Sequence, residues 1–189
     1  ADLVSRTLEQ VAVTPVDEGE PGPTPPHEVT PLDHVAPSTR DATPDDRAEV
    51  VAGFVDAGPA YDAAGFCETV HTRMAYANSA GHRASDAATQ AVVNGIHRKG
   101  VVAGMGHRES RDLAELDGAA VGRLSVELAD RAADPVDLSP GPMPVVLSPE
   151  CVATISIFLG LYGFNAKAVA EGRSFVHLDE QQFDPAFQL

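Results

Sequence analysis

The apolar positions at the start of the chain recur at helical spacing, and a long segment without periodicity follows them. Residues 1–12 place four aliphatic side chains on one helical face, at Leu3, Val4, Leu8 and Val11. Residues 14–44 are dense in proline and acidic side chains. Because proline removes a backbone donor and opposes helix, we expect an extended connector there. Residues 1–44 are therefore interpreted as the end of an N-terminal helix with a proline-rich connector, and residues 45–189 as the main α+β region.

A second helix is predicted to begin after Thr43. Threonine is a good N-cap, Pro44 suits the first helical position, and Asp45 and Asp46 complement the positive end of the helix dipole. Gly58 would end this helix. One of its faces is apolar and carries Val50, Val51, Phe54 and Val55.

From Gly65 onward the spacing changes to the alternation that is typical of strands. We predict three antiparallel strands at roughly 66–77, 83–96 and 101–107, with hairpin loops between them. Alanine and small polar residues are abundant in these strands. This composition indicates that another element packs closely on one face of the sheet.

The clearest helical stripe follows the strands. It predicts a helix over residues 112–133 that covers the sheet, with Leu113, Leu116, Ala120, Leu124 and Leu128 on its buried side. Gly118 and Gly122 indicate close packing of this helix on the sheet, and Asp134-Pro135 would end it.

A short apolar strand at 144–147 and a helix at 149–160 are predicted next. Ser148 is a suitable N-cap, Pro149 fits the first helical position, and Glu150 lies in the first turn. Together these elements predict an α+β fold, in which an antiparallel or mixed β-sheet is packed by helices.

Composition narrows the range of functions. The chain has 189 residues and a formal net charge of −15, and such a field repels phosphate backbones, so nucleic-acid binding is disfavoured. No apolar run reaches the roughly 18 residues of a membrane span, and no secretory signal is visible. Two cysteines without metal-ligand spacing favour a reduced, cytoplasmic setting. The chain opens inside a helical pattern and ends abruptly, from which we expect a fragment of a longer protein.

Metal and phosphate chemistry has little support in the sequence. Its seven histidines lie outside the predicted helices, and no H-E-x-x-H motif or phosphate-binding glycine loop occurs. His71, His97 and His107 could approach one another across the three strands, but histidines on the sheet surface are the commoner case. An acidic cluster near the end is interpreted as solvated loop, with weak metal binding as the alternative; its members are Asp179, Glu180 and Asp184.

Cys151 is the sharpest local candidate for a nucleophile. It lies in the first turn of the predicted 149–160 helix, where helix dipoles favour thiolates. No G-x-C-x-G turn surrounds it, and its neighbours Val152 and Ala153 are apolar. We interpret Cys151 as a buried, unreactive cysteine, with nucleophilic catalysis as the alternative.

Three segments carry a resemblance to a known family: A-N-S-A-G at 77–81, P-V-V-L-S-P at 144–149 and G-R-S-F at 172–175. Over most of residues 60–189 the chain resembles the PmbA/TldD family, whose members are named historically as modulators of DNA gyrase. The resemblance implies a relation to proteolysis, because TldD-type subunits are zinc metalloproteases. Their H-E-x-x-x-H motif lies on the helix after the V-V-L-x-P strand.

The positions of that motif carry other side chains here. Counted from Val145, its two histidines and its glutamate fall on Ile157, Tyr162 and Phe158, and residues 150–176 contain no histidine. Carbon side chains cannot replace the imidazole nitrogens that bind zinc. The resemblance thus implies no catalytic, metal or cofactor-binding residue in this chain, and we expect these side chains to serve as packing.

The resemblance implies instead a PmbA (TldE)-type subunit, which lacks the motif. Such a subunit pairs with a zinc-bearing TldD-type subunit in a heterodimeric protease of small or unfolded peptides. Two alternatives stay open. One is a peptide-binding module without a protease role, which would take up a peptide as an added strand at a sheet edge. The other is an enzyme that depends on Cys151.

Overall fold

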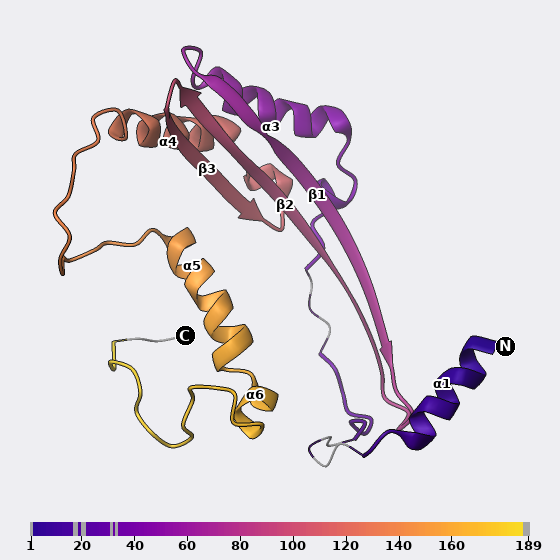
Figure 1. Cartoon of the computed structure of the whole chain (residues 1–189). Coiled ribbons are helices and arrows are strands. Elements are labelled where there is room, and N and C mark those ends of the chain that lie inside the picture. The colour runs from indigo at the N-terminus through magenta and orange to yellow at the C-terminus, as the bar shows by residue number, and fades with distance from the viewer. Residues whose placement is uncertain (1, 17–18, 20–21, 31, 33, 187–189) are drawn as a thin grey trace. The chain divides into compact units, whose positions relative to one another are not determined.

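The computed structural model describes the chain except residues 1, 17–18, 20–21, 31, 33 and 187–189. The described residues form an α+β fold. They divide into two compact units, one of residues 23–139 and the other of residues 1–22 with 140–189. The larger unit contains the sheet and its helices (Figure 1).

The sheet has three antiparallel strands in the order β1 (Asp62–Ala77), β2 (Arg83–Lys99) and β3 (Val102–Ser110). The three predicted strands are confirmed, and each is longer than predicted. β1 and β2 pair one-to-one from Asp62 opposite Arg98 to Ala77 opposite Arg83. Because β3 pairs only with the later part of β2, the β1–β2 hairpin extends beyond it (Figure 1).

Two helices cover one face of this sheet, α3 (Pro44–Asp56) and α4 (Gly118–Arg131). Every second residue of β2 is buried from Thr89 to His97, as expected for a strand with one face on the core. The buried core cluster consists of Phe54, Ala91, Val93, Leu113, Leu116 and Val121. The predicted close covering of one sheet face is therefore confirmed.

The predicted start of α3 is confirmed in its details. Thr43 accepts a hydrogen bond from the Asp46 N–H through its side chain, and the Thr43 N–H donates to the Asp46 carboxylate at 2.7 Å. This reciprocal capping box satisfies two backbone donors that the helix itself cannot satisfy. The bonds from Thr43 also hold the pKa of the Asp46 carboxyl below its usual value.

Glycines set how closely these layers approach. A Cβ on Gly104 of β3 would lie 2.0 Å from the Ser125 carbonyl oxygen of α4, so only glycine permits this helix–sheet contact. Gly118 and Gly122 face α3 rather than the sheet, since a Cβ on Gly118 would lie 1.9 Å from the Val50 oxygen. The prediction that these two glycines pack on the sheet is therefore wrong.

The predicted helix over 112–133 is also wrong at its beginning. Leu113–Glu115 forms a separate 3₁₀ turn, and α4 begins only after Asp117, whose side chain caps the Ala120 N–H at 2.9 Å. The buried face of α4 consists of small side chains, so the predicted stripe is shifted: Leu124 and Leu128 are exposed, whereas Gly118, Val121, Gly122, Ser125 and Ala129 are buried.

A buried polar contact joins α4 to the sheet. The Ser125 hydroxyl donates to the Gly104 carbonyl at 2.8 Å and accepts from the His97 N–H at 2.9 Å. The His97 ring is fully buried and stacks on Phe54 with 4.6 Å between ring centroids. His97 is thus a core histidine, and its interpretation as a histidine on the sheet surface is wrong.

The N-terminal segment contains the predicted helix, α1 (Asp2–Val13), which has no buried residue. Part of the predicted connector is ordered against the sheet. It holds a short helix, α2 (Pro37–Arg40), where buried Thr39 donates to the Arg111 carbonyl at 2.8 Å and accepts from the Leu113 N–H at 2.7 Å. Within 14–44, the connector prediction also falls on six residues outside the described part, at 17–18, 20–21, 31 and 33.

Candidate functional site

The helix that carries the family motif positions begins as the sequence predicts. α5 (Pro149–Phe158) is capped by Ser148, whose hydroxyl accepts from the Cys151 N–H at 3.4 Å. Pro149 occupies the first turn, where its missing donor costs nothing. The helix then continues as a single π-helical turn, Leu159–Gly163, which is closed by the Phe164 N–H donating to the Leu159 carbonyl at 2.9 Å.

The strand predicted just before this helix is absent. Residues 144–147 have no strand assignment and pair with none of the described strands, and Val146 is fully exposed. An apolar run becomes a strand only where a neighbouring strand can bond its backbone. The prediction of a strand at 144–147 is therefore wrong.

The three motif positions form an exposed apolar surface. Ile157, Phe158 and Tyr162 are 60%, 57% and 68% exposed, and the Phe158 and Tyr162 rings stack with 6.2 Å between centroids. The expectation that these side chains serve as packing is wrong within this structure, because α5 has no buried residue. Large apolar side chains that gather on an exposed surface often mark a binding site, so this surface is suited to bind an apolar partner.

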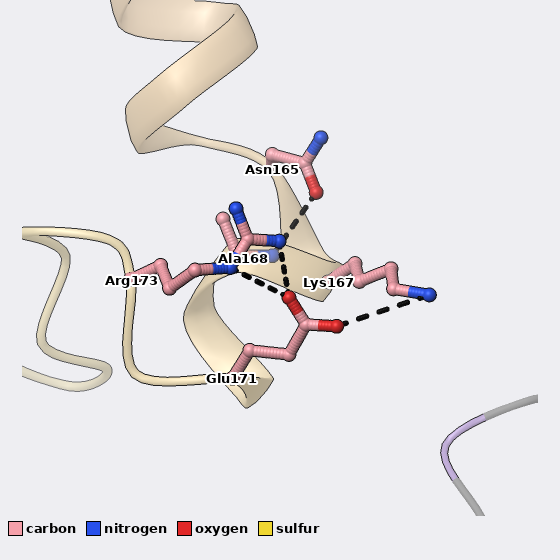
Figure 2. A network of polar contacts seen from close by, with 5 residues as sticks. All are labelled: Asn165, Lys167, Ala168, Glu171 and Arg173. Atoms are coloured by element: carbon pink, nitrogen blue, oxygen red, sulfur yellow. Dashed lines mark hydrogen bonds and ion pairs between the residues drawn. The ribbon is translucent and has the colours of Figure 1, made fainter. Parts of the chain in front are cut away.

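A polar network fixes the chain just beyond α5 (Figure 2). Asn165 caps the short helix α6 (Ala166–Ala170) by accepting from the Ala168 N–H at 3.1 Å. At the other end of α6, Glu171 accepts from Arg173 Nε at 2.7 Å and lies 3.8 Å from the Lys167 ammonium. These bonds hold the turn that leads into the G-R-S-F segment.

The G-R-S-F segment folds back on the end of the π-helical turn. Gly172 has a φ of 66°, which favours glycine, and the Ser174 hydroxyl donates to the Gly163 carbonyl at 2.6 Å. The Phe175 ring occupies the space where a Cβ on Gly163 would lie, at 2.4 Å. Thus G-R-S-F and the end of the α5 segment form one local structure, a relation that sequence spacing alone did not predict.

Cys151 lies on the surface rather than in a core. Its side chain is exposed, so the interpretation of a buried cysteine is wrong. Its apolar neighbours do not bury it because α5 is uncovered on that side as well. The second cysteine, Cys67 in β1, is half-buried, and burial raises the pKa of its thiol.

The candidate metal ligands do not come together. His71 pairs with Thr89, eight residues along β2 from His97, which is about 27 Å at roughly 3.4 Å per residue. His107 pairs with Asn94 and therefore lies on the opposite sheet face from His97. The side chains of Asp179, Glu180 and Asp184 are exposed. Within the described part of the chain, no group of three or more His, Cys, Asp or Glu side chains could hold a metal ion.

No protein-family model matches this chain, and no curated protein matches it in sequence. In the described part of the chain, no helix combines the length and apolar character needed to cross a bilayer.

Proposed function

We propose that this chain is a non-catalytic, PmbA (TldE)-like subunit of a TldD/TldE-type zinc metalloprotease that acts on small or unfolded peptides in the cytoplasm. The zinc ion and the catalytic glutamate would belong to a TldD-type partner subunit. This chain would contribute surface to the heterodimer and to its substrate chamber.

The exposed apolar surface of α5 carries the proposal. The three side chains at the expected motif positions are uncovered, although Ile157 and Phe158 are strongly apolar. In a zinc subunit, this part of the helix would carry two histidines that bind the metal and a glutamate directed at the metal-bound water. Ile157, Phe158 and Tyr162 can instead form apolar contacts with a partner or a peptide, which is what a subunit without the motif requires.

The folded corner after α5 supports the same proposal. G-R-S-F is one of the segments that resemble the family, and it is bonded directly to the end of the π-helical turn that follows α5, because the Ser174 hydroxyl donates to the Gly163 carbonyl. Two of the resembling segments, P-V-V-L-S-P and G-R-S-F, flank α5 and its π-helical turn, which would correspond to the helix on which a TldD-type subunit mounts zinc.

Affinity capture of the full-length protein from native extract tests the proposal. The expected result is co-purification of a protein with an H-E-x-x-x-H motif, with stoichiometric zinc and chelator-sensitive peptidase activity in the complex and neither in the isolated chain. Zinc binding and peptide cleavage by the purified chain alone would contradict the proposal.

A peptide-binding module without a protease role is the second candidate. It is favoured by the outer strands β1 and β3, which pair only with β2 among the described strands and so leave open sheet edges. Such a module would bind unfolded peptide without recruiting a zinc subunit. A Cys151-dependent enzyme is also testable, because its activity would disappear in Cys151→Ala.

A further inference from the structure

Among the described residues, the outer edge of β1 is the longest edge of the sheet without a strand partner. β1 has 16 residues, contains no proline, and keeps an unbroken one-to-one register with β2, so no bulge bends it away. On its other side, it has no ladder partner within the described part of the chain. Proteins usually shorten, bend or charge such edges to prevent pairing with another chain. β1 has only the sparse charges of Asp62, Glu68 and Arg73.

Large apolar side chains line this strand on the sheet face that α3 and α4 leave open. Phe66, Met74 and Tyr76 share that face, because alternate residues of a strand point to the same side, and all three are more than half exposed. A strand added at the β1 edge would place its own side chains beside them and cover part of their apolar area.

α3 lies beside the first half of β1, and Arg47 of α3 donates to the Thr69 hydroxyl at 3.1 Å. An open apolar hollow of about 350 Å³ lies beside the first half of β1. Its lining includes Val51, Phe54 and Val55 of α3 and Gly65 and Phe66 of β1. The second half of β1, from His71 to Ala77, is exposed along its whole length.

We propose that the β1 edges of two copies of this chain pair antiparallel about a twofold axis at Val70, which joins two three-stranded sheets into one continuous sheet. In this arrangement, the helix-covered half of each β1 lies opposite the bare half of its counterpart. The paired segment would be about 50 Å long at roughly 3.4 Å per residue.

The side-chain pattern selects this register. Directly opposed residues in an antiparallel pair point to the same face. The twofold axis must therefore lie between the two copies of a single residue. The longest overlap of the two strands is obtained when that residue is Thr69 or Val70. With the axis at Val70, Phe66 lies opposite Met74, and Ala64 lies opposite Tyr76. With the axis at Thr69, Phe66 would face the hydroxyl of Thr72 instead. Cross-strand apolar pairs favour the first register.

The charges of β1 are compatible with that register. Glu68 lies opposite Thr72, and Arg73 lies opposite Cys67, so no like charges face each other. Axes at Glu68 or Arg73 would oppose identical charges, which is destabilising. The net charge of −15 repels two copies at long range, but physiological salt screens this repulsion over about 8 Å. Dimerisation should therefore strengthen as salt is added.

Site-specific disulfide formation tests the proposal on the whole chain with Cys67 and Cys151 replaced by alanine. Opposed Cα atoms in an antiparallel ladder lie about 4.5–5.5 Å apart, within disulfide range. Val70→Cys should therefore give a covalent dimer under mild oxidation, at twice the 19.7 kDa of the monomer. Ala75→Cys is the matched control, because its own copy would lie about 34 Å away at roughly 3.4 Å per residue.

Two substitutions that introduce a positive charge test the same axis without oxidation. Val70→Lys would oppose two ammonium groups and weaken dimerisation about ten-fold or more, measured by analytical ultracentrifugation. Thr72→Lys would place an ammonium group opposite Glu68 of the second copy, so this variant should preserve or strengthen the dimer. A wild-type chain that is monomeric at high micromolar concentration overturns the proposal. So does equal cross-linking of Val70→Cys and Ala75→Cys, or cross-linking of Val70→Cys to a cysteine-bearing extended peptide in place of a second copy.

Discussion

The unit of residues 23–139 and the segment of residues 140–189 use apolar side chains in opposite ways. In the first, Phe54 is 4% exposed and lies in the aliphatic core cluster, where Gly95 and Gly122 let the neighbouring backbones approach it closely. In the second, Phe158 is 57% exposed on a helix that contains larger apolar side chains but buries none of them. The difference teaches that a closely fitting neighbour, rather than the hydrophobicity of an element, decides its burial.

The largest expected effect compares these two phenylalanines directly. Phe54→Ala should lower the free energy of unfolding by about 3–5 kcal/mol, because it removes a buried ring and leaves a cavity. Phe158→Ala should change it by less than about 0.5 kcal/mol, as for other exposed positions. Urea unfolding followed by circular dichroism measures both. Equal losses of unfolding free energy in the two variants would contradict the difference in burial between Phe54 and Phe158.

Close backbone approach in the sheet unit predicts the next effect. Gly118→Ala should destabilise the chain by about 3 kcal/mol, since the new Cβ would lie 1.9 Å from the Val50 carbonyl oxygen and α3 would have to move. Gly141→Ala in the other region is the matched control, because no atom lies within 4 Å of its added Cβ. Thermal unfolding should separate the variants, and an unchanged midpoint for Gly118→Ala would contradict the described contact.

A smaller effect on stability, which depends on pH, is expected from the capping box at the start of α3. Hydrogen bonds from Thr43 lower the pKa of the Asp46 carboxyl in the folded state. The carboxylate therefore stabilises the fold at pH values above the ordinary carboxyl pKa of about 3.9. That stability is lost as pH falls through the lower folded-state pKa. Asp46→Asn should therefore be less stable than wild type near pH 7, and the gap should close below about pH 4.

Asp45→Asn is the control for the capping box, because Asp45 lies in the same first turn but does not take part in it. Unfolding titrations at several pH values should show a pH-dependent gap that is larger for Asp46→Asn than for Asp45→Asn. Parallel curves for the two variants would show that the Thr43 bonds contribute nothing specific.

Local signals explain what could be predicted from the sequence. Thr43 and Ser148 cap helices through contacts within three residues, and the β-strands alternate over long runs, so α3, α5 and all three strands were predictable. Contacts between distant segments explain the failures. The leucines from Leu113 to Leu128 have helical spacing, but the Asp117 cap and the contact of Gly118 with α3 move the helix start and its buried face.

The candidate site was predictable as a position but not as a surface. Ser148-Pro149 located α5, whereas the exposure of Cys151 and Ile157 depends on tertiary packing that no local sequence pattern indicates. The strand predicted at 144–147 failed because this run pairs with none of the described strands, and an apolar run does not by itself supply a strand partner. The bond between Ser174 and Gly163 joins residues too far apart in sequence for a local pattern to indicate it.

A capture experiment with one surface variant tests whether the exposed α5 surface binds a zinc-bearing partner subunit. Full-length wild type and Ile157→Lys are used as baits in native extract, and the zinc and the H-E-x-x-x-H protein retained by each are quantified. Ile157 is 60% exposed, so the variant should fold like wild type. We expect the wild-type bait to retain a zinc metalloprotease and the Ile157→Lys bait to lose it. No such protein on wild type, or equal amounts on both, would contradict it.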